Sequence, residues 1–273
     1  MILKSKIKPQ FFPDQDQTTV LKMGLQPLPH SQWMLVDADL SQFLNHKIEQ
    51  KKLHQDLVYQ ALPESEEAQV EFYNLLQRHL INDHSYQLLK SGDFVNQEFS
   101  LSWENKIRDL WHCSLWIQED ICLLEKFDDE YILTAASVCS PSNWDMPSKI
   151  GQSVEIIHNP VPGYKEQMSS RVNRLMSGLK PNKSIQRLNW SIQPTGDMFW
   201  RSDLKNYEKS EEKYWRIERQ TLMRLPQTRA IVFGIRVFLH SFSTMSGYKD
   251  FDQSIAKVIK TLPNEQANYK NLR

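Results

Sequence analysis

The sequence has few cysteines and no closely spaced pair of them. Only three occur in 273 residues, Cys113, Cys122 and Cys139, and no C-x-x-C motif is present. Such an odd and widely spaced set argues against a disulfide framework, a zinc site or an iron–sulfur cluster. We expect the three side chains to be buried thiols.

Glycine is scarce, net charge is absent and long apolar runs are missing. The eight glycines form neither G-x-G-x-x-G nor G-x-x-x-x-G-K-[ST], so the chain has no dinucleotide fingerprint and no P-loop. Lys plus Arg and Asp plus Glu both number 33, which argues against nucleic acid and anionic lipid as partners. No run is long enough to span a membrane, and the N-terminal segment reaches Lys8 and Pro9 too soon for a signal peptide. We therefore expect a soluble cytoplasmic protein.

The first half of the chain predicts an extended arm followed by helices. Prolines punctuate residues 1–30, whereas apolar residues recur at helical spacing over 39–57, after Pro63, and over 103–117. We expect residues 1–118 to be an N-terminal arm and helices packed on a core that comprises residues 119–273. Together they would form one integrated domain.

The second half predicts a sheet. Apolar and β-branched residues flank the acidic turn 127–130, which is typical of a β-hairpin. We expect two strands in that hairpin, a connection over 141–164, a helix over 166–179, three strands over 187–192, 214–225 and 230–240, and a closing helix over 251–262. This order predicts an α+β fold, with a five-stranded antiparallel sheet that has helices on one face.

One histidine lies in a connection that is stiffened by prolines. His158 is followed by Asn159-Pro160-Val161-Pro162-Gly163, and proline restricts both its own backbone and that of the residue before it. An imidazole held in one direction suits an axial metal or haem ligand. The absence of C-x-x-C-H means that any haem would be held without thioether bonds. A structural histidine that bonds its own turn is the alternative.

Two arginines interrupt apolar strand faces. Arg219 alternates with Trp215, Ile217, Thr221 and Met223 on one face of its strand, and Arg236 stands in the same position on the next strand. Each must pair with a carboxylate or point at a polar ligand, because an unpaired buried guanidinium costs several kcal/mol. A salt bridge to the helical layer and contact with an anionic ligand are both open. Lys149, in the turn before Gly151, is either a loop lysine or a contact to a propionate.

Ordered blocks along nearly the whole chain form a recognisable pattern. The blocks are Met23-Gly24-Leu25, Pro27-Leu28, Trp33, Asp37, Gln118-Glu119-Asp120, Pro141-Ser142-Asn143-Trp144, Lys149-Ile150-Gly151, Ile157-His158-Asn159-Pro160-Val161-Pro162, Arg187, Asn189-Trp190, Arg216, Glu218-Arg219-Gln220-Thr221-Leu222, Arg224-Leu225-Pro226, Phe233 and Ile235-Arg236. In these blocks the chain resembles a known family, the haem-binding α subunit of the haem-dependent oxidative N-demethylases, which is also known as a domain of unknown function.

The resemblance implies a haem-binding PAS fold used for catalysis, in which His158 holds haem b. It implies oxidation of dimethylamine with O2 and NADPH to methylamine and formaldehyde. Partner subunits would be a reductase and a folate-binding subunit, which carry FMN, a 2Fe-2S cluster and tetrahydrofolate.

On this basis we expect Arg219 to polarise bound oxygen, with Lys149, Asn189 and Arg236 as further pocket residues. Two alternatives remain. One is a haem-based PAS sensor of gas or redox state without turnover, and the other is a PAS-like module that binds an organic ligand or a partner protein.

Overall fold

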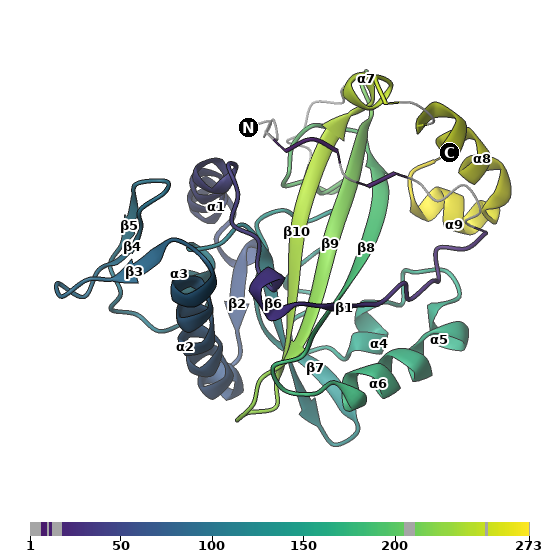
Figure 1. The fold of residues 1–273 in the computed structure, drawn as a ribbon. Coiled ribbons are helices and arrows are strands. Elements are labelled where there is room, and N and C mark those ends of the chain that lie inside the picture. The colour runs from purple at the N-terminus through teal and green to yellow at the C-terminus, as the bar shows by residue number, and fades with distance from the viewer. Residues whose placement is uncertain (1–6, 10, 13–17, 205–210, 249–250, 273) are drawn as a thin grey trace.

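A seven-stranded antiparallel sheet forms the centre of the protein (Figure 1). The computed structural model describes residues 7–9, 11, 12, 18–204, 211–248 and 251–272. The expectation for the first six residues therefore lies outside the described part. In spatial order the strands are β1 (Gln26–Leu28), β8 (Ser184–Gln193), β9 (Tyr214–Arg224), β10 (Ile231–Ser241), β6 (Asp120–Phe127), β7 (Glu130–Ser137) and β2 (Tyr59–Ala61).

The expected α+β class is confirmed, and the expected number of strands in the main sheet is wrong. All five predicted strands are present, as β6 to β10, but β1 and β2 extend the sheet at its two edges. Each of these edge strands has only three residues, too few for the alternation that identifies a strand. Pro27 fits β1 because proline is tolerated on an edge strand, where its missing N–H is not needed.

The N-terminal region contains helices and a second, small sheet. The helices are α1 (Leu40–His54), α2 (Glu66–Asp83) and α3 (Leu110–Ser114), and the sheet has β3 (Tyr86–Leu88), β4 (Phe94–Asn96) and β5 (Leu101–Trp103) in that order. The helix expected over 103–117 is therefore much shorter. It begins where the Asp109 carboxylate accepts a hydrogen bond from the N–H of His112 at 2.8 Å.

Helices cover both faces of the sheet, whereas we expected them on one face only. One face packs on α2 and α3 through a cluster that includes Phe72, Trp116, Leu123 and Met223. The opposite face packs on the connection between β7 and β8, which contains α4 (Val154–Ile157), α5 (Tyr164–Gln167) and α6 (Ser169–Gly178). The central strands carry apolar side chains on both faces, so each face must be covered. The first cluster joins residues on both sides of position 118.

The C-terminal helices close one end of the sheet. The helices α7 (Phe242–Met245), α8 (Phe251–Thr261) and α9 (Asn264–Tyr269) follow β10, and α8 packs on Trp190 and Trp215. In Figure 1, α8 and α9 lie beside β8, on the opposite side of the view from α1 to α3. Among the described residues, no helix combines the length and the apolar content needed to cross a bilayer.

Candidate functional site

A large cavity lies between the sheet and the α4–α6 connection. Its volume is about 710 Å³, within the range of roughly 300–1,000 Å³ typical of small-molecule and cofactor sites. Alternate residues of β8 and β9 form one wall, the α4–α6 connection forms the opposite wall, and residues 20–25 and 268–271 complete the lining. The cavity thus joins parts of the chain that lie far apart in the sequence.

His158 is fixed at the end of α4. It is the C-terminal cap of that helix, and its backbone carbonyl accepts a hydrogen bond from the N–H of Val161 at 2.8 Å. The turn then passes through Gly163, whose φ of 78° is in the left-handed region. A Cβ at this position would lie 2.9 Å from the side chain of Gln167, so only glycine fits without rearrangement. The His158 ring stacks on the ring of Tyr164, with a centroid distance of 4.5 Å.

The hydrogen bonding of His158 defines its tautomer. Nδ1 lies 2.8 Å from the carbonyl oxygen of Val154, and because a carbonyl can only accept, Nδ1 carries the proton. Nε2 therefore keeps its lone pair, which is the usual arrangement of a metal-bound histidine. Burial lowers the pKa of His158, and the positive charges of Arg187 and Lys149 lower it further. The ring is thus neutral near pH 7 and can donate its lone pair to a metal.

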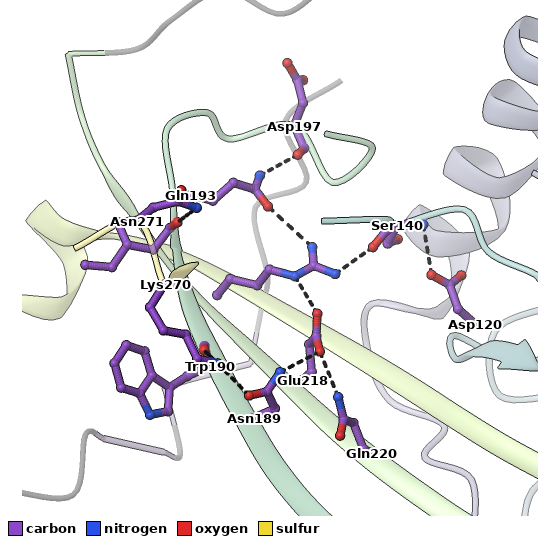
Figure 2. A network of polar contacts seen from close by, with 12 residues as sticks. Asp120, Ser140, Asn189, Trp190, Gln193, Asp197, Glu218, Gln220, Lys270 and Asn271 are labelled. Atoms are coloured by element: carbon purple, nitrogen blue, oxygen red, sulfur yellow. Dashed lines mark hydrogen bonds and ion pairs between the residues drawn. The ribbon is translucent and has the colours of Figure 1, made fainter. Parts of the chain in front are cut away.

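The polar part of the cavity wall centres on Glu218 of β9 (Figure 2). One carboxylate oxygen accepts from Arg216 Nε at 2.9 Å, and the other accepts from Asn189 Nδ2 at 3.1 Å and Gln220 Nε2 at 2.9 Å. Burial alone would raise the pKa of this group, but Arg216, Asn189 and Lys270 together bring it below its ordinary value. Glu218 is therefore ionised at neutral pH.

Arg216 connects Glu218 to the start of β6. Its guanidinium also donates to the carbonyl oxygen of Ser140 at 2.6 Å and to the side chain of Gln193 at 3.4 Å. The N–H of Ser140 in turn donates to Asp120 at 2.9 Å, as Figure 2 shows. Arg216 is only 1% exposed and donates to three acceptors, so its guanidinium is fixed in position. It therefore also fixes the Glu218 carboxylate oxygen that it contacts.

Arg187 of β8 is a positively charged residue in the cavity wall, and one of its N–H donors is unsatisfied. Its Nε is buried and has no hydrogen-bond partner among the residues that the structure describes. Burial lowers its pKa, whereas the negative charge of Glu218 raises it. A buried guanidinium donor of this kind requires an acceptor. An anionic group in the cavity would supply one.

Three of the residues predicted from the sequence line this cavity together. These are His158, Lys149 and Asn189. Lys149 is half-buried in the turn between β7 and α4, and Asn189 stands on β8 directly opposite Glu218 in the strand register.

The two predicted arginines Arg219 and Arg236 lie on the opposite face of the sheet. Arg219 donates to the carbonyl oxygens of Gln32 and Trp33, and its Nη1 is 3.9 Å from Glu119. Arg236 is fully buried, and its Nη2 is 3.1 Å from a carboxylate oxygen of Asp37. Alternation along the strands places them there, because their neighbours in sequence are the residues that face the cavity. The distal role expected for Arg219 and the pocket role expected for Arg236 do not fit this geometry. Glu119 and two N-terminal backbone carbonyls are the partners of Arg219, and the carboxylates of Asp37 and Asp39 are those of Arg236.

Sequence reasoning did not single out Glu218, Arg187 or Lys270. The sequence did contain a signal for Glu218, because Arg216, Glu218 and Gln220 share one face of β9, which is a central strand of the sheet. Polar residues on a covered strand face must have partners or a ligand. Lys270 carried no such signal, because only the tertiary fold brings the C-terminal turn to β8.

A second group of possible metal ligands lies outside the cavity. Ligand atoms of His30, His79 and Asp83 lie within 4.8 Å of one another. However, Nε2 of His79 accepts a hydrogen bond from the N–H of Met34 at 3.5 Å, so the proton of the neutral ring is on Nδ1. Nδ1 is the atom 2.9 Å from Asp83, and a protonated nitrogen does not bind a metal. This group is better described as a structural pair.

The cavity residues fit the haem that the sequence resemblance implies. His158 offers a neutral nitrogen with its other nitrogen fixed, and Arg187 offers an unsatisfied donor for a carboxylate. The apolar side chains around them suit a macrocycle; they include Leu124, Val154, Ile157, Val172, Leu222 and Phe233.

Comparison with known protein families agrees with these features. A family model described as "haem-dependent oxidative N-demethylase, alpha subunit-like" matches residues 24–273, which include most of the cavity wall, with His158 and Lys270. That description names a haem-dependent oxidoreductase and one subunit of a larger assembly. The chain belongs to the family of haem-dependent oxidative N-demethylase, alpha subunit-like proteins.

Proposed function

We propose that this chain is the catalytic haem subunit of an oxidative N-demethylase that acts on a small secondary amine such as dimethylamine. The observation that carries this proposal is the presence, in one cavity, of a neutral imidazole nitrogen on His158 and an ionised carboxylate on Glu218. The first suits iron, and the second suits a protonated amine.

His158 would hold haem b through Nε2, with Arg187 and Lys149 as partners for its carboxylates. Bound haem would supply the redox chemistry, the activation of O2 and the removal of electrons from the amine. The Val154 carbonyl would keep the His158 ring in one orientation and one tautomer. The stacked ring of Tyr164 would restrict rotation of the imidazole.

Glu218 would bind the ammonium group of the substrate. A carboxylate has about four acceptor sites, and three on Glu218 are occupied by Arg216, Asn189 and Gln220. One acceptor site therefore remains for an N–H of the amine. A sensor of a diatomic gas has no use for an ionised carboxylate in its pocket, so this geometry favours the enzyme over the sensor.

Electrons would reach the haem from NADPH through partner subunits. The chain has no dinucleotide fingerprint and no cysteine motif for an iron–sulfur cluster. We therefore assign FMN, the 2Fe-2S cluster and tetrahydrofolate to a reductase subunit and a folate-binding subunit. The products would be methylamine and formaldehyde, and folate would accept the latter.

The test combines haem reconstitution with amine titration. Wild-type protein supplied with haem should develop a Soret band, H158A should lose most of it, and added imidazole should restore it. H240A is the matched control, because His240 is also buried but does not line the cavity. The ferric wild-type band should shift with dimethylamine and not with methylamine. Absence of a Soret band would remove every haem-based function, and indifference to all amines would favour a sensor.

A further inference from the structure

The C-terminal turn of the chain inserts a buried lysine into the polar wall of the cavity. Lys270 follows α9 and is 5% exposed. Its Nζ donates to Asn189 Oδ1 at 2.7 Å and to the carbonyl oxygen of Trp190 at 2.5 Å. The backbone carbonyl of Lys270 also accepts from the N–H of Ile192 at 3.1 Å. This turn is therefore attached to β8 through both its side chain and its main chain.

The buried position of Lys270 is costly and needs a reason. Both acceptors of its ammonium group are neutral oxygens rather than carboxylates. Burial lowers the pKa of Lys270 to about 8; the negative charge of Glu218 opposes this shift, and the positive charge of Arg187 adds to it. Packing of Nζ over the ring of Trp190, 5.3 Å from the centroid, recovers part of the desolvation cost. An apolar side chain would avoid that desolvation cost, so the ammonium group must contribute something that an apolar group cannot.

The ammonium group of Lys270 determines the orientation of the Asn189 side-chain amide. Lys270 can only donate, so it selects the oxygen Oδ1. The amide nitrogen Nδ2 must then face the other way, where it donates to Glu218 at 3.1 Å. Figure 2 shows Asn189 between Lys270 and Glu218. A reversed amide would place its oxygen against the carboxylate and lose both hydrogen bonds.

We propose that Lys270 is a positioning residue of the amine site, which acts through Asn189 to hold the Glu218 carboxylate in the orientation that accepts a small ammonium ion. This proposal rests on the proposed function of Glu218. Lys270 itself does not touch the substrate in this scheme. It keeps the amide nitrogen of Asn189 as a donor to Glu218, so that the remaining acceptor site of the carboxylate faces the cavity rather than the protein.

A double-mutant cycle on amine binding tests the proposal. The dissociation constant of dimethylamine is measured from the Soret shift of haem-loaded wild type, K270M, N189A and the double variant. Loss of a hydrogen bond to a charged group predicts that K270M weakens binding about tenfold or more. K270R, which keeps the charge and the donors, should restore most of the affinity. In the N189A background K270M should have almost no further effect.

Q220A is the matched control background. Gln220 donates to the same oxygen of Glu218 as Asn189 does, but the side-chain hydrogen bond of Lys270 goes to Asn189 and not to Gln220. K270M should therefore keep its full effect in Q220A protein. If K270M does not fold, K270L, which also lacks a donor, takes its place in the same cycle.

The outcomes separate the two proposals. An effect of K270M that is equally large in the N189A and Q220A backgrounds would overturn the relay through Asn189 while leaving Glu218 as the amine site. Unchanged affinity in K270M would overturn it as well. If wild type shows no amine-dependent shift, or E218Q binds amine normally, the proposed function of Glu218 fails first.

Discussion

Replacing Glu218 with glutamine isolates the charge of the amine site. The substitution is nearly isosteric and leaves an oxygen that can still accept from Arg216. It removes the ionised acceptor that an ammonium ion would use. Net hydrogen bonds to charged groups contribute roughly 1.5–3 kcal/mol, compared with roughly 0.5–1.5 kcal/mol for neutral pairs. An ion pair at about 4 Å in a protein environment contributes up to about 4 kcal/mol.

These limits predict a loss of about 1.5 to 4 kcal/mol in binding free energy, which is a roughly 10- to 1,000-fold increase in the dissociation constant. The assay is titration of the haem-loaded ferric protein with dimethylamine, followed by the Soret shift. Cyanide binding to the same samples reports whether the iron site is intact, and it should be unchanged. E125Q is the matched control, since Glu125 lies on β6 of the same sheet and does not line the cavity. A dissociation constant for E218Q within about twofold of wild type, with normal cyanide binding, would refute the assignment of Glu218.

Two further predictions concern residues outside the cavity. R219M should lower the free energy of unfolding by about 3 kcal/mol, because it leaves Glu119 and two backbone carbonyls without their cation. It should leave amine affinity unchanged, and a changed affinity at normal stability would contradict this role. His46 donates to the carbonyl oxygen of Cys139, and burial lowers its pKa to about 4. Protonation of His46 therefore favours the unfolded state, and the free energy of unfolding decreases as the pH falls below 6.5. Urea unfolding at pH 7 and pH 5 should show a loss of about 2 kcal/mol from this residue, absent in H46Q.

Arg219 and Arg236 show what the alternation of side chains along a strand can predict and what it cannot. Periodicity separated Arg219 from Glu218 and Gln220 correctly, because successive side chains of a strand point to opposite faces. It could not say which face was the cavity, since both faces of β9 are covered by helices. We expected the apolar face with one arginine to carry the ligand. The cavity lies on the polar face instead. A covered strand tolerates several polar residues only where they form a closed network or meet a ligand.

The His158 segment was predictable for a different reason. Its prolines and Gly163 constrain the backbone locally, and the ring is fixed by a carbonyl four residues earlier. Local constraints of this kind can be read from the sequence. The edge strands β1 and β2 could not be predicted, because a three-residue strand exists only where a neighbour presents free hydrogen-bonding groups.

The contacts of Lys270 could not be predicted from the sequence, because they depend on the tertiary fold. Its Nζ contacts Asn189 through the packing of the C-terminal turn on β8, which in turn pairs with β9. It follows that the orientation of Glu218 is coupled to the docking of the last turn of the chain. A variant that loosens this turn without removing a partner of Glu218, Asn189 or Lys270, such as N271A, which removes the side-chain donor to the Ile192 carbonyl at 2.8 Å, should weaken amine binding more than haem binding. Equal losses of both would show instead that the turn supports the cavity as a whole.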